Sequence, residues 1–216
     1  MKLVKIVQFT MENKIKINAI FKSVQGEGKF AGYPMLFIRV SGCNRKCSYC
    51  DTKYHIKGKF MTLKELKKEI VKSKMKYICF TGGEPLLYKR QIVKMIKADD
   101  TYREYHIETN GDFLDEIVMN AFDYTACSPK DIKTLKKVKK IYKDWSGCYY
   151  DIKVVTDLKK IGTDMLKYAT RLMPLTTFDE KKDLLISKRV WKYCTENKII
   201  FSPRLHIDVW GSKRRI

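Results

Sequence analysis

The 216-residue sequence contains no apolar run that approaches the roughly 18 residues of a membrane-spanning helix. Its first residues, MKLVKIVQFTMENK, are too few and too interrupted by polar side chains to form a signal peptide. It also has no low-complexity tract, no clear internal repeat and no linker rich in Pro, Gly or Ser. We therefore expect a cytoplasmic protein without a membrane partner. A single domain is predicted over 1–216, with 1–13 as an N-terminal extension to which no motif assigns a role.

Acidic residues are scarce, because 24 Asp and Glu stand against 45 Lys and Arg, and the formal net charge is +21. A field of this sign favours nucleic acid, phosphorylated ligands or an acidic redox protein as partners. The basic residues, however, are mostly lysines scattered along 64–76, 133–143 and 181–192, whereas nucleic-acid sites usually combine arginine with aromatic side chains. We therefore expect solvated helix faces and no nucleic-acid partner.

Apolar residues make up 44% of the chain, which excludes a disordered protein, and short apolar runs alternate with longer amphipathic segments. Strands are predicted at 14–20, 35–40, 76–80, 105–108, 124–127, 149–155, 171–172 and 199–201. Helices are predicted at 63–74, behind a capping box of Thr62 and Glu65, and at 86–97, 113–121, 131–142, 157–168 and 179–197. This alternation predicts an α/β fold, a partial (β/α) barrel of about six parallel strands, since a full barrel needs eight.

Four unusual motifs each follow a predicted strand. GCNRKCSYC comes after 35–40, TGGEP after 76–80, ETNG after 105–107 and SPK after 124–127. Ligands of such folds bind at the carboxyl ends of the parallel strands. We therefore expect the four motifs to converge on one rim and to form the functional site there.

The cysteine content does not suit a disulfide framework, since the seven cysteines are odd in number and unevenly placed. Four isolated ones stand mostly beside apolar residues and are predicted to be buried thiols: Cys79, Cys127, Cys148 and Cys194. The other three, Cys43, Cys47 and Cys50, form a C-x3-C-x2-C pattern typical of iron–sulfur ligands. A 4Fe–4S cluster held by three thiolates would leave one iron open to a small molecule. Structural zinc is the alternative, with His55 or Cys79 as the fourth ligand.

The glycines of TGGEP let the backbone approach a ligand closely. Glu84 of this motif could pair with an ammonium group, or it could belong to a simple turn into a helix that begins at Pro85. Together with the cysteine loop, the motif resembles the radical S-adenosylmethionine (SAM) superfamily. The resemblance implies that the three clustered cysteines bind a 4Fe–4S cluster and that the amino and carboxylate groups of SAM chelate its open iron. It also implies that reduction cleaves SAM to a 5′-deoxyadenosyl radical.

A closer resemblance spans Ile15 to Gly211. FKSVQGEG, FIR, GCNRKCSYCDT, CFTGGEPLL, IETNG, SPK, YDIKVV and RLHIDVWG occur in the order in which the 7-carboxy-7-deazaguanine synthase family has similar motifs. This resemblance implies a single radical SAM domain that converts 6-carboxy-5,6,7,8-tetrahydropterin to 7-carboxy-7-deazaguanine with loss of ammonia. The reaction is a ring-contracting lyase step of 7-deazapurine (queuosine-type) biosynthesis. The implied cofactors are a 4Fe–4S cluster, SAM and Mg2+, and no catalytic residue is implied beyond the cluster and SAM.

The resemblance assigns roles to individual positions. The cluster ligands are Cys43, Cys47 and Cys50, and Thr52 ligates Mg2+. The implied SAM-binding residues are Tyr49, Cys50, Asp51, Gly83, Ser128, Pro129 and Lys130. The implied substrate-binding residues are Val24, Gln25, Gly26, Glu27, Arg39, Thr81 and His206.

Structural roles are the alternatives for several of these residues. A guanidinium at the end of an apolar strand needs a partner, and Arg39 could bind the substrate carboxylate or form a salt bridge with Glu27 or Asp51. Thr52 could be an ordinary capping hydroxyl, and His206 a satisfied interior histidine. Lys130 and Glu108 could pair with each other rather than contact cofactor.

Two other functions remain as alternatives. The first is an activating enzyme that generates a glycyl radical on a partner protein, and the second is an iron–sulfur or zinc module that binds nucleic acid. For the main hypothesis the implied partners are the small-molecule pterin and an acidic reductant, flavodoxin or ferredoxin, which a basic surface suits. The family resemblance also implies that a homodimer can form.

Overall fold

The computed structural model describes residues 13–145, 149–211 and 213, so most of the predicted N-terminal extension and Cys148 lie outside the described residues. In the described part of the chain the strands form one sheet in the order β3-β1-β2-β4-β5-β6-β7-β8-β9. The strands are β1 (Lys14–Val24), β2 (Pro34–Val40), β3 (Lys59–Thr62), β4 (Tyr77–Gly82), β5 (Glu104–Thr109), β6 (Tyr124–Cys127), β7 (Tyr149–Thr156), β8 (Arg171–Pro174) and β9 (Ile200–Phe201).

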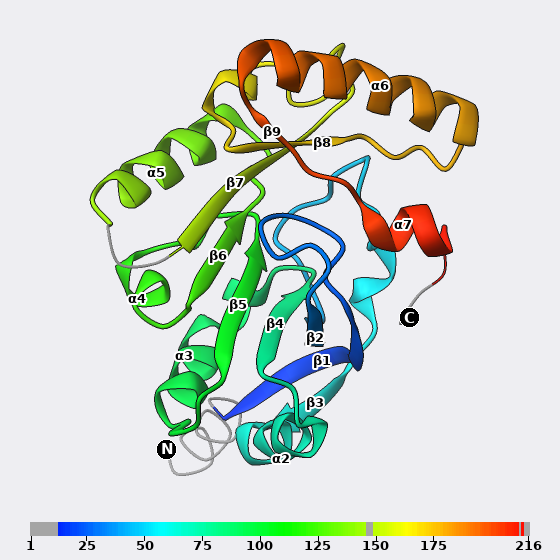
Figure 1. Ribbon diagram of the computed structural model, residues 1–216. Coiled ribbons are helices and arrows are strands. Elements are labelled where there is room, and N and C mark those ends of the chain that lie inside the picture. The colour runs from blue at the N-terminus through cyan, green and yellow to red at the C-terminus, as the bar shows by residue number, and fades with distance from the viewer. Residues whose placement is uncertain (1–12, 146–148, 212, 214–216) are drawn as a thin grey trace.

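Helices follow most of the strands and cover the sheet. They are α2 (Leu63–Ser73), α3 (Lys89–Lys97), α4 (Glu116–Met119), α5 (Ile132–Lys143), α6 (Glu180–Asn197) and α7 (Leu205–Trp210), with 3-10 helices η1 (Lys53–Ile56), η2 (Pro85–Tyr88) and η3 (Leu166–Tyr168). Figure 1 shows α3, α4 and α5 along the outer side of the sheet and α6 over β8 and β9. The main core, which includes Ile78, Phe80, Ile107 and Leu135, is buried within this α/β packing.

The predicted α/β partial barrel is confirmed. β2 and β4 to β9 pair in parallel, which is one strand more than the six or so expected from the strand–helix alternation. β1 pairs antiparallel with both β2 and β3. Within the described residues β3 pairs only with β1 and β9 only with β8, so the sheet stays open. All the parallel strands therefore present their carboxyl ends on one side.

Local sequence signals set the helix starts. Thr62 and Glu65 form the predicted capping box of α2, with the Thr62 side chain accepting from the Glu65 N–H and the Glu65 side chain accepting from the Thr62 N–H. Asp115, Asp131 and Asp179 cap α4, α5 and α6 in the same position. In α6 the buried side chains are those of Ile186, Val190 and Cys194, as helical spacing requires.

The loop between β1 and β2 packs against the inner face of the sheet. Its Phe30 ring lies 4.3 Å from the ring of His106 and 4.8 Å from that of Tyr124, measured between centroids. The Gly28 N–H donates to Ser202 Oγ at 2.9 Å, and the Lys29 N–H donates to Asp151 Oδ2 at 3.1 Å. These contacts hold the segment QGEG in front of the sheet, between β5 and α7 (Figure 1).

One predicted helix, at 157–168, is wrong. Only its last residues are helical, as η3, and the rest is a turn in which Asp157 Oδ1 accepts from the N–H groups of Lys159, Lys160 and Ile161. Leu158 and Gly162 adopt positive φ angles of 59° and 67°, which an α-helix excludes. β3 and α7 were not predicted, because each is too short to show a period.

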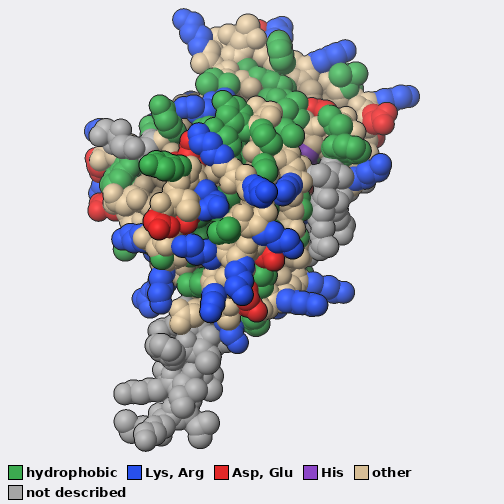
Figure 2. All heavy atoms as spheres, turned by 60° about the horizontal axis from the view of Figure 1, so that its bottom comes forward, with side chains coloured by type: hydrophobic (Ala, Val, Ile, Leu, Met, Phe, Trp, Pro, Cys, Tyr) green, Lys and Arg blue, Asp and Glu red, His purple; other side chains and the backbone are tan. Residues whose placement is uncertain are grey.

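Three of the four isolated cysteines, Cys79, Cys127 and Cys194, are buried as predicted. None of the helices described is long and apolar enough to cross a bilayer. Figure 2 shows Lys and Arg side chains spread over one face of the molecule among neutral and apolar ones, without a single basic patch. This scatter agrees with the expected solvated lysines.

Candidate functional site

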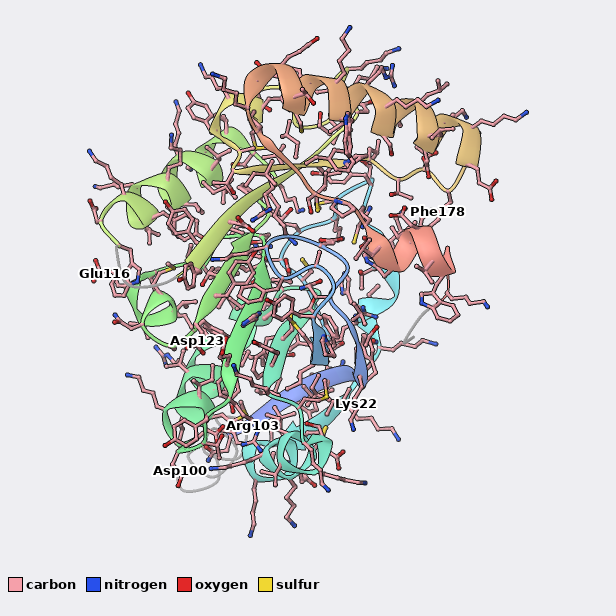
Figure 3. The ribbon with its side chains drawn as sticks, viewed as in Figure 1. Lys22, Asp100, Arg103, Glu116, Asp123 and Phe178 are labelled. Atoms are coloured by element: carbon pink, nitrogen blue, oxygen red, sulfur yellow. The ribbon has the colours of Figure 1, made fainter. Side chains whose placement is uncertain are left out.

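A cavity of about 1010 Å³ lies at the carboxyl ends of the parallel strands. The β1–β2 loop, the cysteine loop after β2, the ends of β4 to β6 and the chain around α7 line it. Phe178, labelled in Figure 3, lies at its rim near α7. The expected convergence of the four motifs is therefore observed.

Nearly all residues with a predicted role line this cavity. They are Val24, Gln25, Gly26, Glu27, Arg39, Cys43, Cys47, Tyr49, Cys50, Asp51, Thr52, Thr81, Gly83, Ser128, Lys130 and His206. Pro129 is the exception, since it is buried and does not line the cavity. The β6 strand ends immediately before this segment, and Ser128 and Lys130 face the cavity while the proline between them packs inward.

The cysteine loop carries three free, half-buried thiols. Their Sγ atoms do not all lie within 4.8 Å of one another; among the described residues the group that meets this spacing is Glu27, Asp51 and His206. Tetrahedral zinc with Zn–S bonds of about 2.3 Å would bring its sulfur ligands to about 3.8 Å from one another. The wider spacing suits a larger, multi-iron group. Cys79, one alternative zinc ligand, is fully buried beside Met35 and does not line the cavity, whereas His55 does.

The cysteine loop and TGGEP meet through their backbones. The Glu84 N–H donates to the Gly42 carbonyl oxygen at 2.8 Å, and a Cβ added to Gly83 would collide with that oxygen. Glu84 itself is fully buried and accepts from the N–H groups of Leu86 and Asn110 and from Thr109 Oγ1. The turn alternative for Glu84 is thus the one observed, and Gly83 is required by the close approach of two loops.

A buried ion cluster lies in the part of the cavity wall that the β1–β2 loop, β5 and β7 form. Lys153, on β7 and 1% exposed, donates to Glu27 at 2.8 Å and to Glu108 at 2.6 Å. The Gln25 side-chain amide donates to the other carboxylate oxygen of Glu108 at 3.1 Å. Glu27, Glu108 and Lys153, which we call the glutamate–lysine triad, all line the cavity.

The two carboxyl groups of the triad have different pKa values. Burial raises the pKa of Glu108 to about 7, since Lys153 offsets the burial only in part and Glu27 adds repulsion. Burial would also raise the pKa of Glu27, but the charges of Lys153 and Arg204 outweigh it and lower that pKa below its ordinary value. Glu27 is therefore the ionised acceptor, and Glu108 is the group that can hold a proton near neutral pH.

Arg204 connects the triad to the segment after the cysteines. Its guanidinium pairs with Glu27 at 3.2 Å and also with Asp51. Thr52 Oγ1 donates to Asp51 Oδ1 at 2.8 Å and lines the cavity, where it can offer a neutral oxygen to a magnesium ion. Burial lowers the pKa of His206. The His206 side chain lies against Gly26, and a Cβ added to Gly26 would collide with His206 Nδ1.

Arg39 and Lys130 have partners other than the structural ones expected. Glu27 and Asp51, the proposed salt-bridge partners of Arg39, are paired with Lys153 and Arg204, and the Arg39 guanidinium lies 5.1 Å from the centre of the Phe21 ring. Glu108 is paired with Lys153, so it is not the partner of Lys130.

Lys130 donates to Ser128 Oγ at 3.1 Å and lies 5.7 Å from the centre of the Tyr49 ring. The SPK motif and the cysteine loop are thus in contact at the cavity. The three residues form one edge at which a SAM molecule could bind.

Sequence reasoning missed Lys153 and Arg204. The signal for Lys153 is a lone charge within the apolar strand YDIKVV, which costs free energy unless a partner is buried with it. Arg204 carried no comparable signal, since the strand before it, β9, has only two residues.

Comparisons with known proteins agree with this geometry. The family model described as the radical SAM superfamily matches residues 37–185. The chain is 36% identical to the 7-carboxy-7-deazaguanine synthase of Methanospirillum hungatei over 80% of this chain and 72% of that protein. It is 29% identical to that of Hyperthermus butylicus over 90% and 92% of the two chains. The crystal structure of QueE from Escherichia coli superposes with a TM-score of 0.55 at 16% identity, over 89% of this chain and 95% of that one.

The pKa of Glu108 leads to a prediction for stability. A carboxyl group whose pKa is raised on folding stabilises the protein fully at low pH, and that contribution is lost as the pH rises from the ordinary pKa of 4.5 towards about 7. The free energy of unfolding of the wild type, minus that of Glu108→Gln, should therefore decrease as the pH rises across this range. Urea denaturation of the apoprotein at a series of pH values measures it. Glu104→Gln, at the surface end of β5, is the matched control. Parallel pH profiles of wild type and Glu108→Gln would contradict the assignment.

Proposed function

The chain belongs to the 7-carboxy-7-deazaguanine synthase family of the radical SAM superfamily, and we propose that it contracts 6-carboxy-5,6,7,8-tetrahydropterin to 7-carboxy-7-deazaguanine with loss of ammonia. The observation that carries this proposal is one cavity that is lined both by three free thiols and by the glutamate–lysine triad. The thiols suit an iron–sulfur cluster and the triad suits a polar heterocycle. We also infer that 1–216 form one radical SAM domain.

The cofactors are a 4Fe–4S cluster, SAM and Mg2+. The thiols of Cys43, Cys47 and Cys50 are the donors for the cluster, and the Thr52 hydroxyl is the donor for Mg2+. When bound, the cluster and SAM supply a one-electron cleavage that generates a carbon radical. We propose that SAM lies along the edge formed by Tyr49, Cys50, Asp51, Gly83, Ser128 and Lys130, all of which line the cavity.

The substrate is proposed to bind between Arg39 and the triad. The planar guanidinium of Arg39 can hold a carboxylate through two hydrogen bonds. Glu27, kept ionised by Lys153 and Arg204, can accept from the guanidine-like edge of the pterin. Val24, Gln25, Gly26, Thr81 and His206 line the same space.

Two further tasks fall to the chain's own residues. Loss of ammonia requires protons to move, and Glu108 lines the cavity with a pKa of about 7, so it can hold a proton near neutral pH. The β1–β2 loop and α7 come together over the cavity, where the Leu205 N–H donates to the Gly26 carbonyl oxygen at 3.0 Å. We propose that this contact helps to shield a reactive radical from water.

The alternative functions have less support. A glycyl-radical activating enzyme has to admit a segment of a partner protein, and the triad of buried charges suits a small polar ligand better. A nucleic-acid module would need a concentrated basic surface, and the face in Figure 2 has a dispersed one. The homodimer and the cytoplasmic location stay predictions.

The function has a direct test. Anaerobic reconstitution with iron and sulfide, followed by reduction in the presence of SAM and the carboxytetrahydropterin, should yield 5′-deoxyadenosine and 7-carboxy-7-deazaguanine by mass spectrometry. Cys47→Ala should abolish both products, because two thiolates cannot hold the cluster, while the far-UV circular dichroism spectrum stays unchanged. Product formed by Cys47→Ala, or 5′-deoxyadenosine without the deazaguanine in the wild type, would count against the proposal.

The role of Arg39 is tested by Arg39→Lys, which keeps the charge and loses the planar fork. We expect the KM for the pterin to rise by about 10-fold or more, since one good charge-assisted contact accounts for roughly 1.5–3 kcal/mol. Cleavage of SAM without substrate should stay within about two-fold of wild type. Equal losses in both measurements would remove the proposed substrate contact.

We also propose that an acidic flavodoxin or ferredoxin is the reductant and approaches at the cysteine loop. Lys46 and Lys53 are exposed there and lie at the cavity. The variant Lys46→Glu/Lys53→Glu should slow SAM cleavage several-fold with flavodoxin at low salt, and leave the rate with dithionite unchanged. The control is Lys68→Glu/Lys72→Glu on α2, which makes the same charge change far from the loop. Equal slowing by both double variants would show that net charge alone is responsible.

A further inference from the structure

Arg45 lies between the first two cysteines of the loop and makes a dense set of contacts. Its Nε donates to Asp112 Oδ2 at 2.6 Å, and its Nη2 donates to Asp112 Oδ1 at 2.5 Å and to Thr134 Oγ1 at 2.9 Å. Its Nη1 pairs with Asp131 Oδ2 at 2.6 Å. One guanidinium therefore joins the cysteine loop to the loop after β5 and to the first turn of α5.

The neighbouring side chains extend this set of contacts. Asn44 donates to Asp112 Oδ2 at 2.6 Å and accepts from the Asn110 side-chain amide at 2.9 Å. Asp131 Oδ1 accepts from the Thr134 N–H at 2.7 Å as the helix cap, while its other oxygen holds Arg45. We call Arg45, Asp112 and Asp131 the arginine clamp.

Backbone contacts do not hold this part of the loop. In the described part of the chain, no backbone–backbone hydrogen bond involves residues 43–46, whereas Gly42 on one side makes two and Cys50 on the other side makes one. The segment that carries Cys43 and leads to Cys47 is thus attached through the side chains of Asn44 and Arg45. The loop has no regular secondary structure to fix it otherwise.

The geometry is stronger than that of an ordinary surface ion pair. Isolated exposed pairs contribute about 0–1 kcal/mol, but Arg45 makes a two-pronged contact with one carboxylate and a second ion pair with another. The side chains of Arg45 and Asp112 are only 25% and 16% exposed. The Arg45 N–H also donates to Cys43 Sγ at 3.4 Å, so the clamped residue itself contacts a ligand sulfur.

We propose that Arg45 is a positioning residue for the iron–sulfur cluster, and that its clamp fixes the Cys43–Cys47 segment and the N–H group that faces Cys43 Sγ. The inference rests on the proposed function, since it concerns the same three thiols. Hydrogen bonds to ligand sulfurs and the rigidity of the surrounding shell influence both the retention and the reduction potential of such clusters. The clamp therefore influences both the retention of the cluster and its reduction potential.

The test uses the full-length chain with Arg45→Met and Arg45→Lys. In the apoprotein, hydrogen–deuterium exchange of the residue 45 amide, relative to its intrinsic rate, should become faster in both variants, because neither reproduces the two-pronged contact that holds this N–H against Cys43 Sγ. In the reconstituted protein, loss of iron to a chelator should become about 10-fold faster or more. The midpoint potential of the cluster should fall in both variants, since the N–H bond to sulfur weakens. If Arg45→Met folds poorly, the same measurements can be made on Arg45→Lys, which keeps the charge.

Two controls separate the clamp from simple charge. Lys46→Met removes a neighbouring exposed cation and should leave exchange, iron loss and potential unchanged. Arg45→Met/Asp112→Asn restores the local net charge of the wild type but not the clamp, and should stay defective. Wild-type behaviour of this double variant or of Arg45→Lys, or equal effects of Lys46→Met, would overturn the proposal. The exchange measurement needs no cluster, so failure of the clamp and failure of the proposed function give different results.

Discussion

The buried ammonium of Lys153 is the interaction on which the arrangement of the site depends. An ion that is 1% exposed is strongly destabilising unless its partners are buried with it, and removal of one member of such a group typically costs about 3–5 kcal/mol. Glu27 comes from the β1–β2 loop, Glu108 from β5 and Lys153 from β7. Arg204, at the start of α7, completes the charge balance at Glu27. Because these buried charges must pair with one another, three segments that are distant in the sequence are held around one cavity.

Close contacts at two glycines fix other parts of the cavity wall. Gly83 lies so near the Gly42 carbonyl that no side chain fits between them, and Gly26 lies equally close to His206. Glu84 holds the first of these contacts from behind, because its buried carboxylate accepts hydrogen bonds from the chain after both β4 and β5. Short strands thus end in loops whose positions are set by one another, and these loops complete the cavity wall together with η1 and α7.

The fold and most of the site could be predicted from the sequence because each depends on local pattern. The strand–helix alternation gave the parallel sheet, and its direction placed the four motifs on one rim. The incorrect predictions also have physical causes. Residues 157–168 have helix-compatible composition, but the Asp157 side chain satisfies the backbone of a turn instead. Pro129 lies inside a motif whose flanking residues face the cavity, and only the direction in which the chain leaves β6 distinguishes them.

Ion-pair partners were the least predictable feature, since Lys153 and Glu27 are 126 positions apart and no spacing rule relates them. Asp112, Asp131, Glu27 and Glu108 hold loops or cavity walls, and each is paired with a Lys or Arg side chain. The excess of 45 Lys and Arg over 24 Asp and Glu is therefore carried by other residues. The external field is then more positive than an even mixture of charges would give. A field of this sign would favour the approach of the acidic electron donor proposed above.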